Sequence, residues 1–287
     1  MELADIRSVR FDPIVDGYAH EPAEYGGVRA EVVIPDGLPA HSPDTILYFH
    51  GGGYLTGTPE QYRGATVPLA RAANAKVIAV DYRWAPEHPF PAAHDDGFAV
   101  YRSLVGENGL DPARLALAGD SAGAALSLSV LAAARAAGLP LARCAYLNSP
   151  YADMTASSPS LDQPEYNQGR VRKDRVVWMM SEYLSANDAD PRDPRHSPVF
   201  ADLTGIPGLL IQVGGRDPLH DDGVRLAARA RDCGVQVRLT EYPASEHIWI
   251  VTGTRPADPE AQRAIAEAGQ FISACLDQPR PGNSERN

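Results

Sequence analysis

The feature that most constrains the fold is a regular alternation of short apolar runs with longer helical patterns. The runs are bounded by turn residues and are nearly continuously apolar, which is typical of parallel strands buried on both faces. The patterns between them are rich in alanine and leucine, and several end at glycine or asparagine. This alternation predicts a doubly wound, mostly parallel α/β sheet flanked by helices. The expected strands are 45–50, 76–80, 114–119, 143–148, 208–214 and 235–242, and the expected helices are 59–73, 92–105, 121–137, 221–233 and 258–276.

Two regions depart from this alternation. The first ~40 residues have the pattern of short strands joined by turns, which indicates an antiparallel edge of the sheet. Residues 151–200 form a long connection between two strands, with an amphipathic helix expected from about Val171 to Leu184. A connection of this length inside a compact domain usually has a function of its own, and we expect a lid.

Composition excludes several classes of function. The chain has 287 residues and a formal net charge of −11, with 37 acidic against 26 basic residues, so nucleic acid is a poor candidate partner. No apolar stretch approaches 18 residues, and the first residues include acids and arginines, so we expect no membrane span and a cytoplasmic protein. The three cysteines are far apart along the chain, which favours core packing over a disulfide or zinc site: Cys144, Cys233 and Cys275.

The segment GDSAG (119–123) follows the expected strand 114–119 and precedes a helix. A G-x-S-x-G pattern in a strand–turn–helix context is the tight turn that lifts a serine above the edge of a sheet. A serine hydroxyl is a poor nucleophile by itself and needs a base that is oriented by a third group. Ser121 is therefore a candidate nucleophile if such a pair is present.

The candidate base and acid follow the serine in chain order. Asp217 lies just past the strand 208–214, and His247 lies just past the strand 235–242. In this fold the acid and the histidine stand on loops after later strands, so order and placement both indicate a triad with Ser121. Other histidines and acids lie at a helix start, beside prolines or in loops without a preceding strand: His20, His41, His88, His94, His196, His220, Asp221 and Asp222. Glu246 adjoins His247 and is expected to point away from it.

The ordered motifs together resemble a known family. They are HGGG (50–53), DYRWAPEHPFPAA (81–93), GDSAG (119–123) and GRDPLHDD (215–222), followed by a late histidine. This combination resembles the bacterial hormone-sensitive-lipase-like carboxylesterases of the α/β-hydrolase superfamily. The length fits one large α/β domain with an insertion or two small domains, and we expect a single α/β-hydrolase domain over 1–287. The resemblance implies an esterase acting on short- to medium-chain esters, no metal or organic cofactor, and catalysis by Ser121, Asp217 and His247. By analogy with relatives, the final helix could support a homodimer.

The glycine run and the helix start predict where the oxyanion of the reaction is held. Ala122 begins the helix after the serine, and its N–H is one expected donor. By the resemblance, the N–H groups of Gly52 and Gly53 are the others. Side chains at these glycines would block a substrate carbonyl, which explains three glycines in a row.

The chain also departs from the family pattern. Only 49 residues precede HGGG, so the N-terminal half of the small helical cap, about 1–25, is expected to be reduced, and 151–200 supplies the rest. Glycine commonly follows the catalytic histidine in the family, whereas Ile248 and Trp249 follow it here. We expect small acyl groups and a pocket lined by six residues: Tyr54, Trp178, Met179, Leu219, Ile248 and Trp249. Ordinary packing of helix 171–184 is an open alternative for Trp178 and Met179.

Other interpretations remain open at this stage. A lactone, N-acetyl or formamide hydrolase would use the same triad, and a ligand-binding protein on a retired hydrolase fold would not need it. A dehydratase on this fold is more remote. Asp81, Arg83 and Glu87 could form a second catalytic set, but a structural ion-pair loop is the better interpretation.

Overall fold

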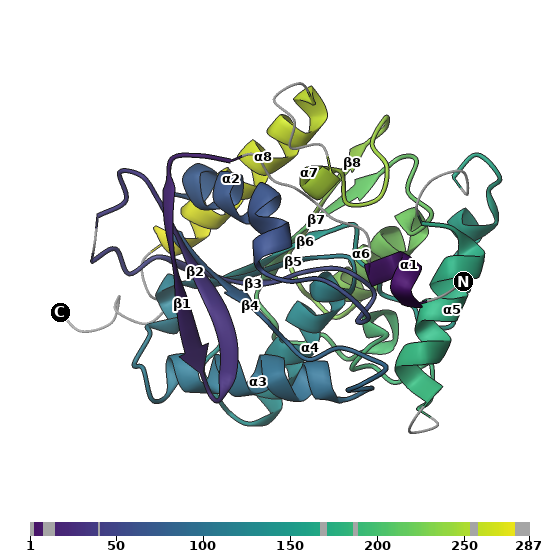
Figure 1. Cartoon of the computed structure of the whole chain (residues 1–287), viewed down its shortest axis with the longest axis horizontal. Coiled ribbons are helices and arrows are strands. Elements are labelled where there is room, and N and C mark those ends of the chain that lie inside the picture. Colours follow the sequence, from purple (N-terminus) through teal and green to yellow (C-terminus); the bar gives the residue numbers. More distant parts are fainter. Residues whose placement is uncertain are drawn as a thin grey trace.

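A mixed sheet forms the centre of the computed structural model, which describes residues 3–7, 15–39, 41–166, 171–185, 189–252 and 258–278 (Figure 1). Its strand order among the described residues is β1-β2-β4-β3-β5-β6-β7-β8. The pairs β1–β2 and β2–β4 are antiparallel and all the others are parallel, which confirms the predicted fold class and antiparallel edge. The strands are β1 (Tyr18–Tyr25), β2 (Val28–Pro35), β3 (Thr45–Phe49), β4 (Lys76–Val80), β5 (Leu115–Asp120), β6 (Cys144–Asn148), β7 (Gly208–Gly214) and β8 (Val237–Tyr242).

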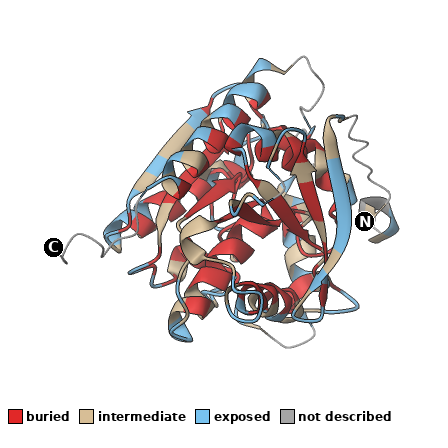
Figure 2. Cartoon of the chain, turned by 90° about the vertical axis from the view of Figure 1, so that its left-hand side faces the viewer, coloured by how far each residue is buried: buried red, intermediate tan, exposed pale blue. Residues whose placement is uncertain are grey.

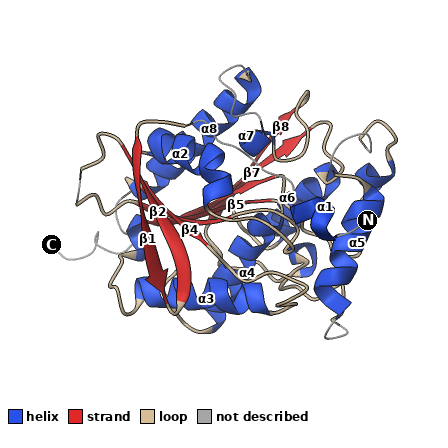
Figure 3. Cartoon of the chain, in the orientation of Figure 1, coloured by secondary structure: helices blue, strands red, loops and turns tan. Residues whose placement is uncertain are grey.

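Helices cover both faces of the sheet and divide the core in two (Figures 1 and 3). Residues of α2, α7 and α8 pack on one face, and residues of α3, α4 and α6 pack on the other. The central strands are buried, and exposed residues gather on the outer helix faces and on β1 (Figure 2). The helices are α1 (Leu3–Arg7), α2 (Arg63–Ala73), α3 (Ala92–Val105), α4 (Ala122–Ala136), α5 (Lys173–Leu184), α6 (His220–Asp232), α7 (Trp249–Thr252) and α8 (Pro259–Leu276).

The regular elements agree closely with the sequence analysis. The predicted strands 76–80 and 208–214 and the predicted helix 92–105 have the observed ends. These elements are long apolar runs or periodic patterns with clear breaks. The short helix α7 was not predicted, because four residues carry no periodicity. None of the helices in the described ranges is long and apolar enough to cross a membrane.

The two regions expected to form a cap are partly described. Within 151–200, α5 is a helix beside the carboxyl ends of the strands (Figure 3), and residues 167–170 and 186–188 lie outside the described residues. Within 1–25, residues 18–25 form the edge strand β1 rather than a covering element, because they pair along their whole length with β2. Residues 1–2 and 8–14 lie outside the described part of the chain.

Candidate active site

Ser121 stands on a sharp turn between β5 and α4. Its backbone has φ 51° and ψ −120°, a conformation that is strained for a residue with a side chain. The turn is held from both sides, because the Ser121 N–H donates to the Asn148 carbonyl at 2.9 Å and the Ser121 carbonyl accepts from the Tyr151 N–H at 3.0 Å. A side chain at Gly123 would collide with the Phe49 carbonyl. The tight turn predicted from GDSAG is therefore present.

The structure brings Ser121, His247 and Asp217 together. The Ser121 Oγ and the His247 Nε2 are 3.0 Å apart. On the other side of the ring, the His247 Nδ1 lies 2.9 Å from Oδ1 and 3.0 Å from Oδ2 of Asp217. The Leu219 N–H donates to Asp217 Oδ1 at 2.8 Å and fixes the carboxylate. A base in contact with a hydroxyl and oriented by a buried carboxylate is the arrangement that activates a serine.

The electrostatics of the pair suit this arrangement. Burial raises the pKa of Asp217, but the charge and hydrogen bond of His247 and the N–H of Leu219 outweigh burial and hold that pKa below its usual value. Burial lowers the pKa of His247, but the charge and hydrogen bond of Asp217 outweigh it and raise that pKa. The carboxylate is therefore ionised, and a proton that arrives on the imidazole is stabilised.

The glycine segment is fastened to the serine turn through Asp120. The Asp120 Oδ1 accepts from the Tyr48 hydroxyl at 2.6 Å and from the Gly51 N–H at 3.1 Å. The N–H groups of Gly52, Gly53 and Ala122 donate to no acceptor among the described residues. These are the three donors that the sequence indicated for an oxyanion.

Two of these glycines are required by their surroundings. Gly52 has φ 108°, and a side chain there would collide with the Thr56 carbonyl. Gly53 has φ 62°, and a side chain there would collide with the Met179 methyl group of α5. The backbone can approach a ligand closely only because both positions lack a Cβ.

His50 is buried beside the glycine segment (50–53) and contacts its backbone. Its Nδ1 lies 2.7 Å from the Gly51 carbonyl, and its ring stacks on Tyr82 with centroids 4.3 Å apart. The Tyr82 hydroxyl donates to the His50 carbonyl at 2.7 Å. Burial lowers the pKa of His50 to about 4, so the ring is neutral near pH 7.

Four of the six predicted pocket residues lie on one side of the sheet. Tyr54 and Leu219 are buried in the core cluster with α3 and α4, and Trp178 and Met179 of α5 pack against that cluster. The Tyr54 hydroxyl donates to the Ala122 carbonyl at 2.9 Å, and its ring stacks on Tyr183 of α5 at 4.2 Å. Tyr54 therefore supports the site from within, while Met179 covers the glycine segment.

Ile248 and Trp249 pack on the opposite side. Trp249 is buried with the residues of α2 and α8, and its ring centroid lies 5.2 Å from that of Tyr242. Ile248 also packs against that cluster. The chain reverses at Ile248, which has φ 49°, so His247 faces the serine while Trp249 points into the core. The structure does not bring the Trp249 ring to Ser121.

The loop 81–87 carries ion pairs to other segments. Asp81 pairs with Arg29 at 2.8 Å and Arg83 with Asp96 at 2.7 Å, as expected of a structural loop. Glu87 pairs with Arg7 of α1 at 2.5 Å.

Arg7 ties the first helix to the glycine segment. Its guanidinium donates to the carbonyls of Leu55 and Ala85 at 3.2 and 3.1 Å and lies 4.1 Å from the Trp84 ring centroid. These contacts have no signal in the sequence, because they join Arg7 to residues 48 and 78 positions away.

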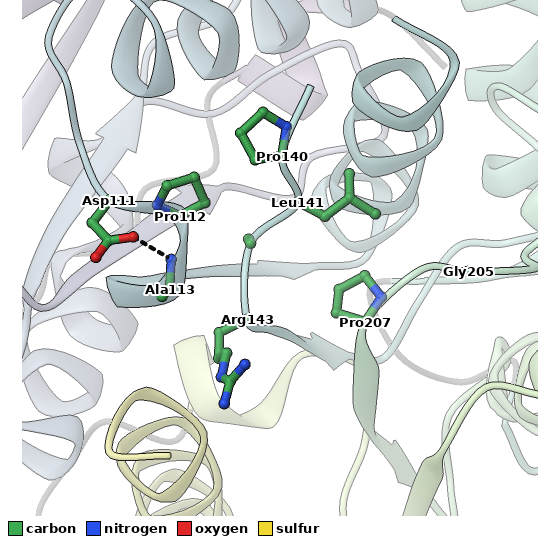
Figure 4. A pocket seen from close by; sticks show the side chains of 9 residues that line it. Asp111, Pro112, Ala113, Pro140, Leu141, Arg143, Gly205 and Pro207 are labelled. Atoms are coloured by element: carbon green, nitrogen blue, oxygen red, sulfur yellow. Dashed lines mark hydrogen bonds between the residues drawn. The ribbon is translucent and has the colours of Figure 1, made fainter. Parts of the chain in front are cut away.

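A separate pocket lies at the opposite end of the sheet. Its lining comes from the segments that precede β5, β6 and β7 and includes Asp111, Pro140, Arg143 and Pro207 (Figure 4). The proposed catalytic residues follow the strands rather than precede them, so this pocket is not part of their site. Among the described residues, no group of three or more His, Cys, Asp or Glu side chains is placed to hold a metal ion.

Comparison with known proteins agrees with the fold. The chain matches the α/β-hydrolase fold family over residues 46–251. An acetyl-hydrolase of Streptomyces hygroscopicus is 42% identical over 228 residues, which cover 79% of this chain and 75% of that protein. An ethyl acetate hydrolase of Pseudomonas putida is 35% identical over 228 residues, which cover 77% and 70%. The crystal structure of an esterase from the bacterial hormone-sensitive lipase family superposes with a TM-score of 0.86 at 37% identity, over 96% of this chain and 89% of that one.

The chain therefore belongs to the α/β-hydrolase family. Within it, the protein is a hormone-sensitive-lipase-like carboxylesterase of the bacterial type, and thus a carboxylic-ester hydrolase.

Proposed function

We propose that this esterase hydrolyses short- to medium-chain acyl esters with Ser121 as nucleophile, His247 as general base and acid, and Asp217 as the orienting acid. The observation that carries the proposal is the continuous contact from Ser121 Oγ to His247 Nε2 at 3.0 Å and from His247 Nδ1 to Asp217 at 2.9 Å. Both distances lie within hydrogen-bond reach, as general-base activation of a hydroxyl requires.

The reaction is a two-step acyl transfer. His247 Nε2 takes the Ser121 proton while Oγ attacks the ester carbonyl carbon and the carbonyl π electrons move to oxygen. The tetrahedral intermediate then expels the alcohol, which leaves with the proton from His247. Water attacks the acyl-enzyme with the same histidine as base and releases the carboxylic acid. Each N–H that holds the oxyanion contributes a factor of ~10²–10³ in rate, and we assign this role to Gly52, Gly53 and Ala122.

The surroundings of the glycine segment support small acyl groups. Met179 lies directly against Gly53, so α5 narrows the space next to the proposed oxyanion site. Two relatives carry names that refer to acetyl groups and ethyl acetate, which agrees with this preference.

We also propose that the chain forms a single domain in which the segment 151–200 acts as the main cap element.

The test is turnover of p-nitrophenyl acetate by Ser121→Ala. Ser273 of α8 offers a matched serine-to-alanine control on the far side of the sheet. We expect Ser121→Ala to lose at least ~10³ of kcat and to escape labelling by a fluorophosphonate probe, while Ser273→Ala stays within twofold of the wild type. Wild-type turnover by Ser121→Ala would rule the mechanism out.

Hydrolysis of an N-acetyl group is the second candidate, because the name of the acetyl-hydrolase relative specifies the acetyl group and not the bond that is cleaved. The same residues would act on an ester, a lactone, an N-acetyl or a formamide group, and the pocket would decide between them. A panel of p-nitrophenyl acetate, acetanilides and lactones at equal concentration separates these substrates.

A further inference from the structure

The loop that follows β6 touches all three proposed catalytic segments. Asn148 and Tyr151 hold the backbone of Ser121 from both sides, as described above. Ser149, between them, is completely buried, and its N–H donates to the Gln212 carbonyl of β7 at 2.8 Å. The neighbouring strands thus fix the backbone at Ser149, and this backbone sets the direction of the Ser149 side chain.

The Ser149 hydroxyl faces the histidine loop. Its Oγ accepts a hydrogen bond from the Ile248 N–H at 3.1 Å. The same hydroxyl also lowers the pKa of the Asp217 carboxyl, after the contributions of burial, His247 and Leu219. The Ser149 side chain therefore binds the backbone of the residue that follows the proposed base.

Ile248 is the residue in this loop that most needs to be held. It has φ 49°, and the left-handed region is strongly unfavourable for a β-branched side chain. Ser149 has φ 45°, so two strained residues are joined by the hydrogen bond between them. Strain of this kind persists only where the surroundings over-determine it.

The reversal at Ile248 decides where His247 points. Because the chain turns there, the histidine faces Ser121 while Trp249 enters the core beside α8. If Ile248 relaxed to an extended conformation, the imidazole could not keep both its contact with Ser121 and its contact with Asp217. Such a loss of alignment by a fraction of an ångström lowers the rate of reaction more than it lowers substrate binding.

We propose that Ser149 is a positioning residue for ester hydrolysis: its hydroxyl holds the left-handed Ile248 through the backbone N–H, and so keeps His247 aligned with Ser121 and Asp217. The inference rests on the proposed triad. It predicts a specific dependence between two residues that do not touch substrate in the mechanism above.

The experiment is a double-mutant cycle between Ser149→Ala and Ile248→Gly, with kcat and KM measured on p-nitrophenyl acetate. Glycine has no penalty at φ 49° and needs no support there. We expect Ser149→Ala to lower kcat by about tenfold with KM changed less than twofold, since a hydrogen bond of this type is worth about a power of ten. In the Ile248→Gly background the same substitution should lower kcat by less than threefold, which is the signature of coupling.

Ser149→Gly separates the hydroxyl from the backbone. It removes the hydroxyl but relieves the strain at residue 149, so a loss of kcat equal to that of Ser149→Ala assigns the effect to the hydroxyl. Equal losses of kcat from Ser149→Ala in both Ile248 backgrounds would overturn the proposal. So would a failure of both Ser149 variants to fold that Ile248→Gly does not repair, because the hydroxyl would then act on the fold.

The proposed function is checked in the same series with Ser121→Ala. An active Ser121→Ala variant would refute the triad itself. An inactive Ser121→Ala variant beside a fully active Ser149→Ala variant would refute only the role of Ser149.

Discussion

Replacing Asp120 with asparagine separates the charge of this buried group from its shape. Oδ1 of Asp120 holds the Tyr48 hydroxyl and the Gly51 N–H, whereas Oδ2 has no hydrogen-bond partner among the described residues. Burial raises the pKa of Asp120 from 3.8 to about 7, in spite of the hydrogen bond from Tyr48. Asparagine keeps an acceptor at Oδ1 and does not titrate.

The pH dependence follows from the direction of this shift. Below pH 3.8 the Asp120 carboxyl is protonated in both the folded and the unfolded chain, so it does not make the free energy of unfolding depend on pH. Between about pH 4 and pH 7 the unfolded chain releases the proton while the folded chain keeps it, so the wild type loses about 1.4 kcal/mol of unfolding free energy per pH unit. The loss reaches about 4 kcal/mol near pH 7 and is constant above it. The stability of Asp120→Asn relative to the wild type should therefore grow by about 3 kcal/mol between pH 5 and pH 7.

Urea unfolding, followed by tryptophan fluorescence at pH 5, 6, 7 and 8, measures this difference. Asp232→Asn, at an exposed position of α6, is the control for removal of a carboxylate. A difference between Asp120→Asn and the wild type that is the same at pH 5 and pH 7 would refute the reasoning.

Three further results are expected. Met179→Ala should raise the rate on a p-nitrophenyl C8 ester, relative to the rate on the acetate, by about tenfold. Val177→Ala, at an exposed position of α5, should leave that ratio unchanged. An unaltered chain-length profile for Met179→Ala would show that α5 does not line the acyl pocket. Asp217→Asn should lower kcat and move the acid limb of the kcat/KM profile to lower pH, because Asp217 raises the pKa of His247; a limb that stays in place contradicts this coupling. Tyr183→Ala should lower the free energy of unfolding in urea by about 3–5 kcal/mol. Tyr183→Phe should change it by less than about 1 kcal/mol, because the Tyr183 hydroxyl has no hydrogen-bond partner among the described residues. Equal losses from both variants would contradict the view that the ring of Tyr183, stacked on Tyr54, supplies the stability.

The proposed catalytic residues could be located from the sequence because each has a local signal. Ser121, Asp217 and His247 each lie within five residues of the end of a strand, and the carboxyl ends of parallel strands meet at one edge of the sheet. Gly52 and Gly53 have a different local signal. Close approach of a ligand to the backbone requires residues without a side chain, and a run of glycines supplies them.

The direction of the chain after the histidine could not be predicted. Ile248 is β-branched, and such residues favour extended backbone, yet it adopts a left-handed conformation. That single dihedral angle places Trp249 in the core instead of the pocket. Ser149 has no such signal in the sequence for a related reason: its side-chain partner Ile248 lies 99 positions away and meets it only after β6, β7 and β8 have paired.

The contact of Arg7 with the glycine segment has a practical consequence for work on this enzyme. An affinity tag fused at Met1 begins six residues from the guanidinium that binds the carbonyls of Leu55 and Ala85. A fusion there could compete for those carbonyls or for Glu87 and disturb the backbone next to the proposed oxyanion site. Recombinant protein for kinetic comparison should therefore carry its tag after Asn287 or have it removed before assay.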